Sequence, residues 1–354
     1  HCKLKDKRFM KKISRRDFLR ASAVMASGLM LSSEEALARK VETSDSVKTL
    51  SNKNKCIYDA KDLPTVVLGK TGVTIPRMAF GLGSRFCTIK SEEEADNILR
   101  KALDSGLYYW DTASVYSNAD GKIISESRIG NVVKENRNRI FLSTKISNRD
   151  PYEAMRSIEL SMRRMETDHF DILMIHDVHS LEDNKKILEK GGLLDILYRM
   201  KEEKVARFIG FSGHADPRAL TDMAEKGNFD TMLFAMNHWP GGKGNLSDRQ
   251  EQVIPVAQRK NMGIMLMKVI RPLDTIKELN ADELVRYALS LDGPHGITVG
   301  MDSMKVLESN LRILKEFKPM SSLEMKRVEM ALTPFFHHEN LPWMNEDYFD
   351  GFWS

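Results

Sequence analysis

Four side chains in the first half of the chain have the types and the spacing of a proton-transfer site. They are Asp111, Tyr116, Lys145 and His176. A free phenol has a pKa near 10 and is a poor proton donor at neutral pH. A nearby ammonium is expected to lower that pKa, while a carboxylate would hold the ammonium in place and a histidine could orient a substrate oxygen. The set predicts protonation of an oxygen that is becoming an alkoxide, as when hydride is delivered to a carbonyl.

Each of these residues also has a structural interpretation. Asp111 could cap a helix, Lys145 could be a solvated strand end, and His176 could be a hydrogen-bonded core histidine. The chemical interpretation is favoured because these three residues end three successive predicted strands, and catalytic side chains of βα barrels lie at the carboxyl ends of strands.

Eight short β-rich runs alternate with helix-periodic stretches and would position these side chains. The runs are Met78–Gly83, Tyr108–Thr112, Ile140–Ile146, Phe170–His176, Phe208–Ser212, Met232–Asn237, Gly263–Val269 and Ile297–Met301. The stretches between them include Glu92–Asp104, Tyr152–Met165, Asp195–Glu203, Asp248–Lys260 and Ala281–Leu291. Most runs are apolar on both faces, as buried parallel strands are. The alternation predicts an α/β fold, a closed (β/α)8 TIM barrel over residues 63–320, with a doubly wound open sheet as the alternative.

The predicted barrel carries additions at both ends. Val66–Ile75 is expected to form an N-terminal β-hairpin that covers one mouth of the barrel. Residues 321–354 are expected to form a C-terminal helix and an aromatic-rich tail. The tail could pack against the outer helices, dock a partner, or line an apolar substrate pocket.

The N-terminal segment has the order of an export signal. Arg15 and Arg16 lie in a basic region, an apolar run from Ala21 to Leu31 follows, and Ala36-Leu37-Ala38 is a small-x-small cleavage pattern. This order predicts a twin-arginine signal over residues 1–38, recognised by the twin-arginine export machinery and leading to the periplasm. The alternative is an amphipathic surface helix with a basic start. Residues 39–62 are expected to be a flexible leader.

Charge and hydropathy exclude two classes of partner. The net charge of +4 is concentrated in residues 1–38, which carry +5 and leave the remainder at −1. The body therefore lacks the basic surface that nucleic-acid binding needs. No run approaches 18 consecutive apolar residues, so stable membrane insertion is not expected.

Several motifs resemble the aldo-keto reductase family. They are DTASVY at 111–116, STK at 143–145, DILMIH at 171–176 and LGKTG at 68–72. The likeness runs from about Pro64 to Phe317 in the correct order. It implies an enzyme that interconverts a small aldehyde or ketone and its alcohol, with a nicotinamide cofactor bound by the barrel and no Rossmann domain. Tyr116 would be the proton donor, Lys145 would tune its pKa, Asp111 would pair with Lys145, and His176 would orient the carbonyl.

The resemblance also implies cofactor-binding residues. They are Ser212, Asn237, Met267, Lys268, Gly300, Ser303, Glu308 and Asn310. Three positions depart from the family pattern: Gly213 replaces an Asn, Leu233 stands where many members have Gln, and Val306 stands where an arginine often meets the 2′-phosphate of NADP. The expected cofactor is NADP, with NAD as the alternative. The segment 210–214 resembles a branch that often carries a C-terminal iron–sulfur extension, but the chain lacks the cysteines for a cluster.

Two other functions stay open. A metal-dependent barrel hydrolase could draw its ligands from Lys145, His176, His179, His214, His238 and Asp302. It would leave Asp111 and Tyr116 without a role, and the first strand lacks the H-x-H that such hydrolases usually carry. A catalytically lapsed, reductase-like binding or sensing protein would suit the weak cofactor matches. The presence of all four residues of the proton-transfer set favours an enzyme, and no metal is expected in the site.

Overall fold

The structure is a computed structural model that describes residues 56–214, 216–236, 248–270, 276, 278–333 and 351. The expected export signal, most of the expected leader, Asn237, His238 and nearly all of the aromatic tail lie outside these residues. Within the part of the chain that is described, no helix has both the length and the apolar character needed to cross a bilayer.

Eight parallel strands close into a barrel, in the order β10-β3-β4-β5-β6-β7-β8-β9. Their bounds are Met78–Gly81 (β3), Tyr109–Asp111 (β4), Phe141–Ile146 (β5), Phe170–Ile175 (β6), Ala206–Gly213 (β7), Thr231–Ala235 (β8), Gly263–Met267 (β9) and Gly296–Gly300 (β10). The last strand pairs with both the first strand of the barrel and β9. The predicted (β/α)8 barrel is therefore confirmed, and the open sheet is wrong.

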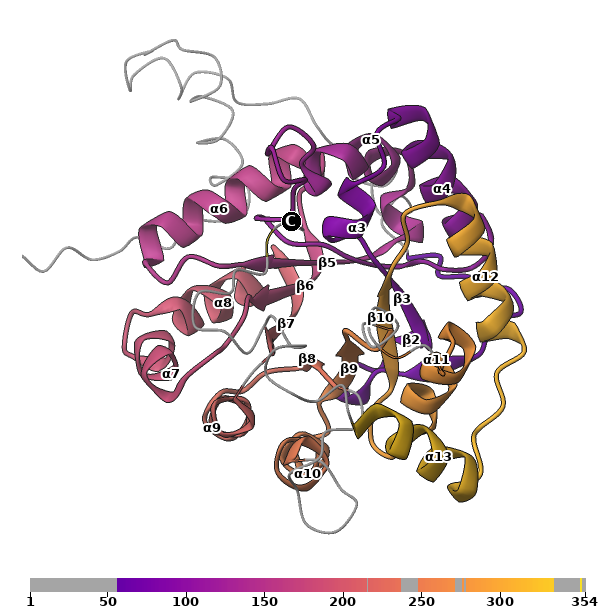
Figure 1. The fold of residues 1–354 in the computed structure, drawn as a ribbon. Helices are drawn as coiled ribbons and strands as arrows, with labels where there is room; N and C mark the ends of the chain where they lie inside the picture. The colour runs from indigo at the N-terminus through magenta and orange to yellow at the C-terminus, as the bar shows by residue number, and fades with distance from the viewer. Residues whose placement is uncertain are drawn as a thin grey trace, which may run out of the picture.

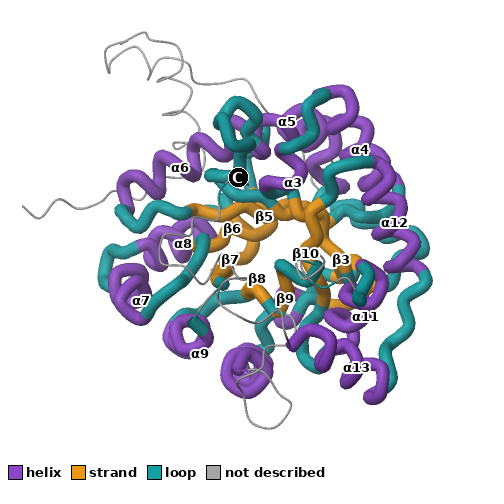
Figure 2. Tube along the Cα trace, in the orientation of Figure 1, coloured by secondary structure: helices purple, strands orange, loops and turns teal. Residues whose placement is uncertain are grey.

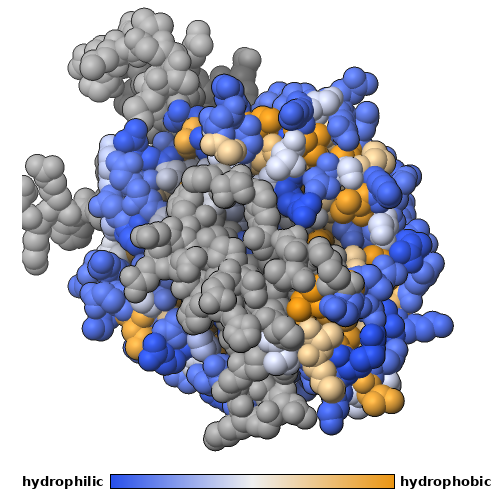
Figure 3. Space-filling view, viewed as in Figure 1, coloured by the Kyte–Doolittle hydropathy of each residue, from blue (hydrophilic) through white to orange (hydrophobic). Residues whose placement is uncertain are grey.

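Helices surround the strands, so Figures 1 and 2 show strands at the centre and helices at the rim. The α-helices are Ser84–Cys87 (α3), Glu92–Asp104 (α4), Ser125–Asn136 (α5), Pro151–Arg164 (α6), Leu181–Leu188 (α7), Leu193–Glu202 (α8), Pro217–Lys226 (α9), Ile254–Arg259 (α10), Ala281–Ser290 (α11), Met304–Lys315 (α12) and Ser322–Leu332 (α13). A π-helical turn, η4 (Arg249–Val253), precedes α10. The outer surface over the rim helices is mainly hydrophilic (Figure 3), since their apolar faces pack against the barrel.

Helix α4 shows how the sequence sets an element's limits. Its bounds coincide with the predicted ones because the Ser91 side chain accepts a hydrogen bond from the Glu94 N–H at the first turn. Three glutamates in that turn complement the helix dipole. Strand limits are less sharp: the run expected to reach residue 237 ends as β8 at Ala235, and β7 begins two residues before the predicted Phe208.

The N-terminal hairpin closes the base of the barrel, as expected. It consists of β1 (Thr65–Val67), the 3-10 turn η2 (Gly69–Thr71) and β2 (Thr74–Pro76). Gly69 has φ of +47° and lies so close to β9 that an added Cβ would be 2.5 Å from the Gly263 nitrogen. Only glycine fits there, because both the backbone conformation and the space exclude a side chain.

Residues 56–62 fell within the expected flexible leader, but Tyr58 packs firmly against the base. Its ring stacks on Tyr108 at a centroid distance of 5.1 Å. Its hydroxyl donates a hydrogen bond of 2.7 Å to the buried Asp171. The segment around Tyr58 is thus part of the folded body, because an aromatic side chain and a buried carboxylate hold a stretch whose composition is polar.

Candidate active site

The structure brings the four residues of the predicted proton-transfer set together at the carboxyl ends of β4, β5 and β6. The Lys145 Nζ lies 2.6 Å from Asp111 Oδ2 and 3.4 Å from the Tyr116 hydroxyl oxygen. It also donates a 2.8 Å hydrogen bond to the Thr112 carbonyl. The ammonium stands 4.9 Å from the centre of the Tyr116 ring. One cation therefore contacts both the carboxylate and the phenol.

This ion pair is removed from water. The Lys145 side chain has no exposed surface and that of Asp111 is 3% exposed. Burying such a pair costs desolvation energy, and removal of one partner would strand the other charge in the interior. The loop that follows β4 is fixed from below, because Thr112 Oγ1 and Ser125 Oγ are 2.8 Å apart and Ser125 donates to the Leu82 carbonyl. Tyr116 thus lies on a loop that is fixed by hydrogen bonds, next to the buried Lys145 ammonium.

His176 completes the set on the far side of Tyr116. The two rings meet edge to face, with centroids 5.5 Å apart and an interplanar angle of 83°. The Nδ1 of His176 lies 3.0 Å from Ser147 Oγ. His176 follows β6 directly, so its backbone continues the strand while its ring faces the phenol.

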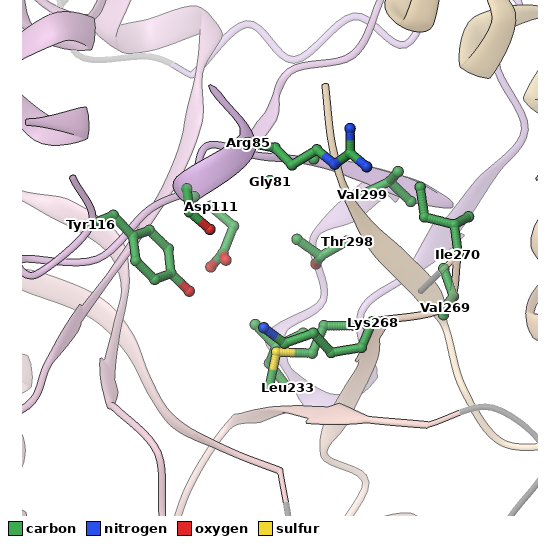
Figure 4. Close-up of a pocket in the computed structure, with 14 residues that line it drawn as sticks. Gly81, Arg85, Asp111, Tyr116, Leu233, Lys268, Val269, Ile270, Thr298 and Val299 are labelled. Carbon is green, nitrogen blue, oxygen red and sulfur yellow. The ribbon is translucent and has the colours of Figure 1, made fainter. Parts of the chain in front are cut away.

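A pocket of about 140 Å³ opens at this end of the barrel. Asp111 and Tyr116 line one side of it, and Leu233, Met267 and Lys268 line another. Figure 4 shows the Tyr116 hydroxyl and the Asp111 carboxylate pointing into the space that Lys268 and Arg85 border. The pocket therefore joins a proton-transfer set to two cationic side chains.

Only some of the expected cofactor residues lie at the pocket. Met267, Lys268 and Gly300 line the pocket, whereas Ser212 is buried in β7 and its Oγ accepts a hydrogen bond from the Asp177 N–H. Ser303 caps α12 by accepting from the Val306 N–H. Glu308 is exposed on that helix, and Asn310 is buried. Asn237 lies outside the described residues.

The structure shows what surrounds two of the positions that depart from the family pattern, Gly213 and Leu233. At Gly213 an added Cβ would lie 2.6 Å from both the Leu220 side chain and the Val178 carbonyl, so an asparagine does not fit without a shift. Leu233 is buried and forms an apolar part of the pocket wall, where an amide would otherwise stand. Packing at the end of β7 thus accounts for the glycine.

A second histidine, His214, follows β7 directly and lies in a polar cluster. His214 Nδ1 is 2.7 Å from Asp177 Oδ1, and the His214 carbonyl accepts a hydrogen bond from Arg249. Arg249 is fully buried and also donates to the Ala235 carbonyl, so it joins the ends of β7 and β8. Burial lowers the pKa of Arg249 to about 10, which still leaves it charged at neutral pH. Within the described ranges, no three His, Cys, Asp or Glu side chains converge in a way that could hold a metal ion.

Three residues near the site were not anticipated from the sequence. Ser147 and Arg149 follow β5, and Arg85 lies on α3, where it forms a 2.5 Å ion pair with Asp302 at the pocket mouth. The strand-end rule that selected Lys145 also covers Ser147, because β5 ends at Ile146. Nothing in the residue types around Arg85 singles it out, since its role depends on the pairing of β10 with β3.

Comparisons with known proteins identify a family model and several relatives. Residues 77–273 match the model of the aldo/keto reductase family. An L-galactose dehydrogenase of Arabidopsis thaliana is 23% identical over 78% of this chain and 95% of its own length. A pyridoxal 4-dehydrogenase of Microbacterium luteolum is 23% identical over 57% of this chain and 69% of its own. The chain spans only 39% of an uncharacterised oxidoreductase of Bacillus subtilis, to which it is 29% identical.

The solved structures agree in fold. The holo form of the aldo-keto reductase AKR11C1 from Bacillus halodurans superimposes with a TM-score of 0.62 at 19% identity, covering 78% of this chain and 99% of that one. A putative aldo-keto reductase of Pseudomonas gives a TM-score of 0.58 at 21% identity, over 75% of this chain and 98% of that one. With the family model matched over more than half of its length, this chain belongs to the aldo/keto reductase family.

Proposed function

We propose that this protein is an NAD(P)H-dependent oxidoreductase that interconverts a small aldehyde or ketone and its alcohol, with Tyr116 as the proton donor. The observation that carries the proposal is the position of the Lys145 Nζ, 2.6 Å from the Asp111 carboxylate and 3.4 Å from the Tyr116 hydroxyl. A cation held at that distance favours the phenolate over the phenol, which is what a proton donor needs as it gives up its proton.

The residues of this chain divide the work of carbonyl reduction. A reduced nicotinamide, when bound, would supply the hydride with its two electrons. Tyr116 donates its proton to the carbonyl oxygen, and the resulting phenolate is stabilised by Lys145 until solvent reprotonates it. Asp111 keeps the ammonium in place. The His176 ring, beside Tyr116, orients the substrate oxygen by hydrogen bonding. The same steps in reverse oxidise an alcohol.

The residues present fit a dinucleotide. Lys268 and Arg85 line the pocket and place two cationic groups near a diphosphate, Arg85 from within its ion pair with Asp302. Among the described residues, the Asn310 Nδ2 and the Thr298 Oγ1 are buried without a hydrogen-bond partner. Buried polar atoms in that state are costly, so a ligand that supplies their partners would stabilise the protein. We propose NADP as the cofactor, with NAD as the alternative, held by Ser212, Lys268, Gly300 and Asn310.

The substrate is proposed only as a class. The dehydrogenases of Arabidopsis and Microbacterium carry names of alcohol or aldehyde substrates, which supports oxidation or reduction of a small polar compound. The Ser117 N–H, next to Tyr116, donates a 3.1 Å hydrogen bond to the carbonyl of Gly351. Gly351 therefore contacts the loop that carries the proton donor.

The test is a fluorescence titration of the mature protein with NADPH and with NADH, followed by turnover with a panel of aldehydes and ketones. Tyr116→Phe should retain cofactor binding and lose turnover by about 10²- to 10⁴-fold, the usual contribution of general acid catalysis. Tyr152→Phe, at a tyrosine that is 70% exposed, is the matched control and should turn over normally. Binding without turnover in the wild-type protein would instead favour a sensing protein.

We further propose export by the twin-arginine route to the periplasm, on the basis of Arg15 and Arg16 ahead of the apolar run. A full-length protein with Arg15→Lys and Arg16→Lys should stay in the cytoplasmic fraction, whereas the unaltered chain is processed and exported. Equal export of both would contradict the proposal.

A further inference from the structure

We propose that Ser147 is a positioning residue that fixes the tautomer of His176, by donating its hydroxyl proton to Nδ1 so that the ring proton stays on Nε2. The catalytic consequence rests on the function proposed above, while the tautomer itself does not. Ser147 Oγ lies 3.0 Å from Nδ1 of His176, which is a normal hydrogen-bond distance.

For a neutral imidazole, the chemistry of the two groups leaves one productive arrangement. A neutral imidazole has one N–H donor and one acceptor nitrogen, whereas a hydroxyl can act in either direction. A carbonyl oxygen is only an acceptor, so His176 must present an N–H to it. With Nδ1 hydrogen-bonded to Ser147 Oγ, we place the substrate oxygen at Nε2. Ser147 must then donate, because a proton on Nδ1 would leave Nε2 with a lone pair facing another lone pair.

Arg149 holds the backbone on both sides of this hydrogen bond. Its guanidinium donates to the carbonyls of Ser147, His176 and Asp177, at 2.9, 2.8 and 2.8 Å. These carbonyls belong to the segments that leave β5 and β6, which are the segments that carry the serine and the histidine. The relative position of Ser147 and His176 is therefore set by one side chain that bridges two strand exits.

The guanidinium is itself anchored to a helix. Its Nε and Nη2 contact the two carboxylate oxygens of Asp183 on α7 at 2.9 and 2.7 Å, a bidentate arrangement. The Asp183 side chain is 6% exposed, and its N–H is bonded to Ser180, which caps α7. Such a rigid support is what orientation of a reacting group requires, because displacement by a fraction of an ångström weakens catalysis.

Arg149 also holds the backbone in an unfavourable conformation. Asp177 has a positive φ of +53°, in the left-handed region that is costly for a residue with a side chain. This turn comes directly after His176, and its carbonyl is one of those bound by Arg149. The strained turn at the exit of β6 is thus stabilised at the point where it sets the direction of the histidine.

The inference is tested by long-range ¹H–¹⁵N NMR of histidine side chains in the mature protein at neutral pH, with the His176 signals assigned by difference from His176→Gln. The wild-type protein is expected to show neutral His176 with its proton on Nε2 and a hydrogen-bonded Nδ1. Ser147→Ala should remove the hydrogen-bond signature of Nδ1 and introduce the other tautomer, and Ser147→Thr, which keeps the hydroxyl, should restore the wild-type pattern. Ser157→Ala, at a partly buried serine on α6 that bonds the Glu153 carbonyl, is the matched control.

Turnover provides the second readout. Ser147→Ala should lower kcat/KM for carbonyl reduction about tenfold, the usual worth of one oriented hydrogen bond, with cofactor binding and melting temperature unchanged. A His176 proton on Nδ1, a doubly protonated ring, or a spectrum unaffected by Ser147→Ala would overturn the inference, even if the enzyme is active. Absence of any carbonyl turnover in the wild-type protein would overturn the proposed function instead, since the NMR result stands apart from activity.

Discussion

The two ends of the barrel each bury a carboxylate beside a tyrosine, and their electrostatics are opposite. At the base, the Tyr58 hydroxyl donates directly to Asp171, and burial together with that negative charge raises the pKa of Tyr58 well above its usual value. At the carboxyl end, an ammonium stands between Asp111 and Tyr116. A phenol against a carboxylate keeps its proton, whereas a phenol against a cation can release it.

The two carboxylates also differ in how fully they are bonded. Asp171 uses both oxygens, accepting from Tyr58 and Arg207 on one and from the Leu142 N–H and Arg137 on the other. Burial alone would raise the pKa of Asp171, but the charges of Arg137 and Arg207 hold it below its usual range. Asp111 uses one oxygen for Lys145, and its buried Oδ1 has no partner among the described residues. The base is saturated and stabilises the fold; the opposite end retains unmet hydrogen-bonding capacity for ligands.

The largest expected effect of breaking this contrast is on turnover at the carboxyl end. Lys145→Met should lower kcat by about 10³-fold, because Tyr116 loses the cation that stabilises its conjugate base. The measurement is steady-state reduction of an aldehyde with saturating cofactor. Lys134→Met, at an exposed lysine that pairs with Glu166, is the control and should change turnover little. Turnover by Lys145→Met at the wild-type rate would contradict the proposed electrostatic difference between Tyr116 and Tyr58.

At the base the largest effect should be on stability. Arg137→Met leaves the buried Asp171 with part of its charge uncompensated and should lower the free energy of unfolding by about 3–5 kcal/mol. Urea unfolding gives this value, and kcat of the folded variant should stay near that of the wild-type protein. Arg139→Met breaks the exposed pair with Asp104 and a hydrogen bond to the Asn136 side chain, and it should cost less than about 1 kcal/mol. A large loss of kcat in folded Arg137→Met, with little change in its free energy of unfolding, would contradict the assignment of the base to stability.

A smaller effect at the base concerns pH. The N–H groups of Gly69 and Ile264 lie 3.1 and 3.0 Å from the two ring nitrogens of His295. A neutral imidazole accepts from one of them at its unprotonated nitrogen, whereas an imidazolium accepts from neither. Burial lowers the pKa of His295. The unfolded chain therefore takes up a proton near pH 6.5 that the folded chain resists, so stability should fall as the pH drops below about 6.5 and level off below the folded-state pKa.

The measurement for His295 is the free energy of unfolding between pH 5 and pH 8. The wild-type protein should lose more stability across this range than His295→Gln, because the variant lacks the titrating ring. His179→Gln, at an exposed histidine, should behave like the wild-type protein. Parallel curves for the wild-type protein and His295→Gln would show that protonation of His295 does not affect stability, which would contradict this prediction.

The smallest expected effect is on thiol reactivity, since each region has one cysteine. Cys56 is exposed at the base, whereas Cys87 is buried in α3 beside the pocket, where burial raises the pKa of its thiol to about 11. Iodoacetamide at pH 8 should modify Cys56 and leave Cys87 unmodified until the protein is unfolded, with no change in turnover. Mass spectrometry of the native and unfolded protein checks this, and equal labelling or a disulfide between the two would contradict it.

Sequence patterns were sufficient for the barrel because buried parallel strands and amphipathic helices each leave a periodic signal. They also placed Lys145 and His176 at strand ends, where position along the chain determines position in space. They did not reveal Arg149 or Tyr58, because the partners of these side chains depend on which strands are neighbours and how far the chain extends below the barrel. Tyr58 lies in a polar segment with no periodicity, and only its contacts with Tyr108 and Asp171 show that it belongs to the folded body.

The central claim is that the Lys145 ammonium stabilises the Tyr116 phenolate. The most direct measurement is an ultraviolet pH titration of tyrosine ionisation. The Tyr116 contribution is obtained by subtracting the curve of Tyr116→Phe from that of the wild-type protein. The same subtraction is made between Lys145→Met and the double variant that carries both substitutions. Ionisation of Tyr116 is expected at a lower pH when Lys145 is present than when it is replaced. An unchanged transition, or one at a lower pH in the absence of Lys145, would contradict the account.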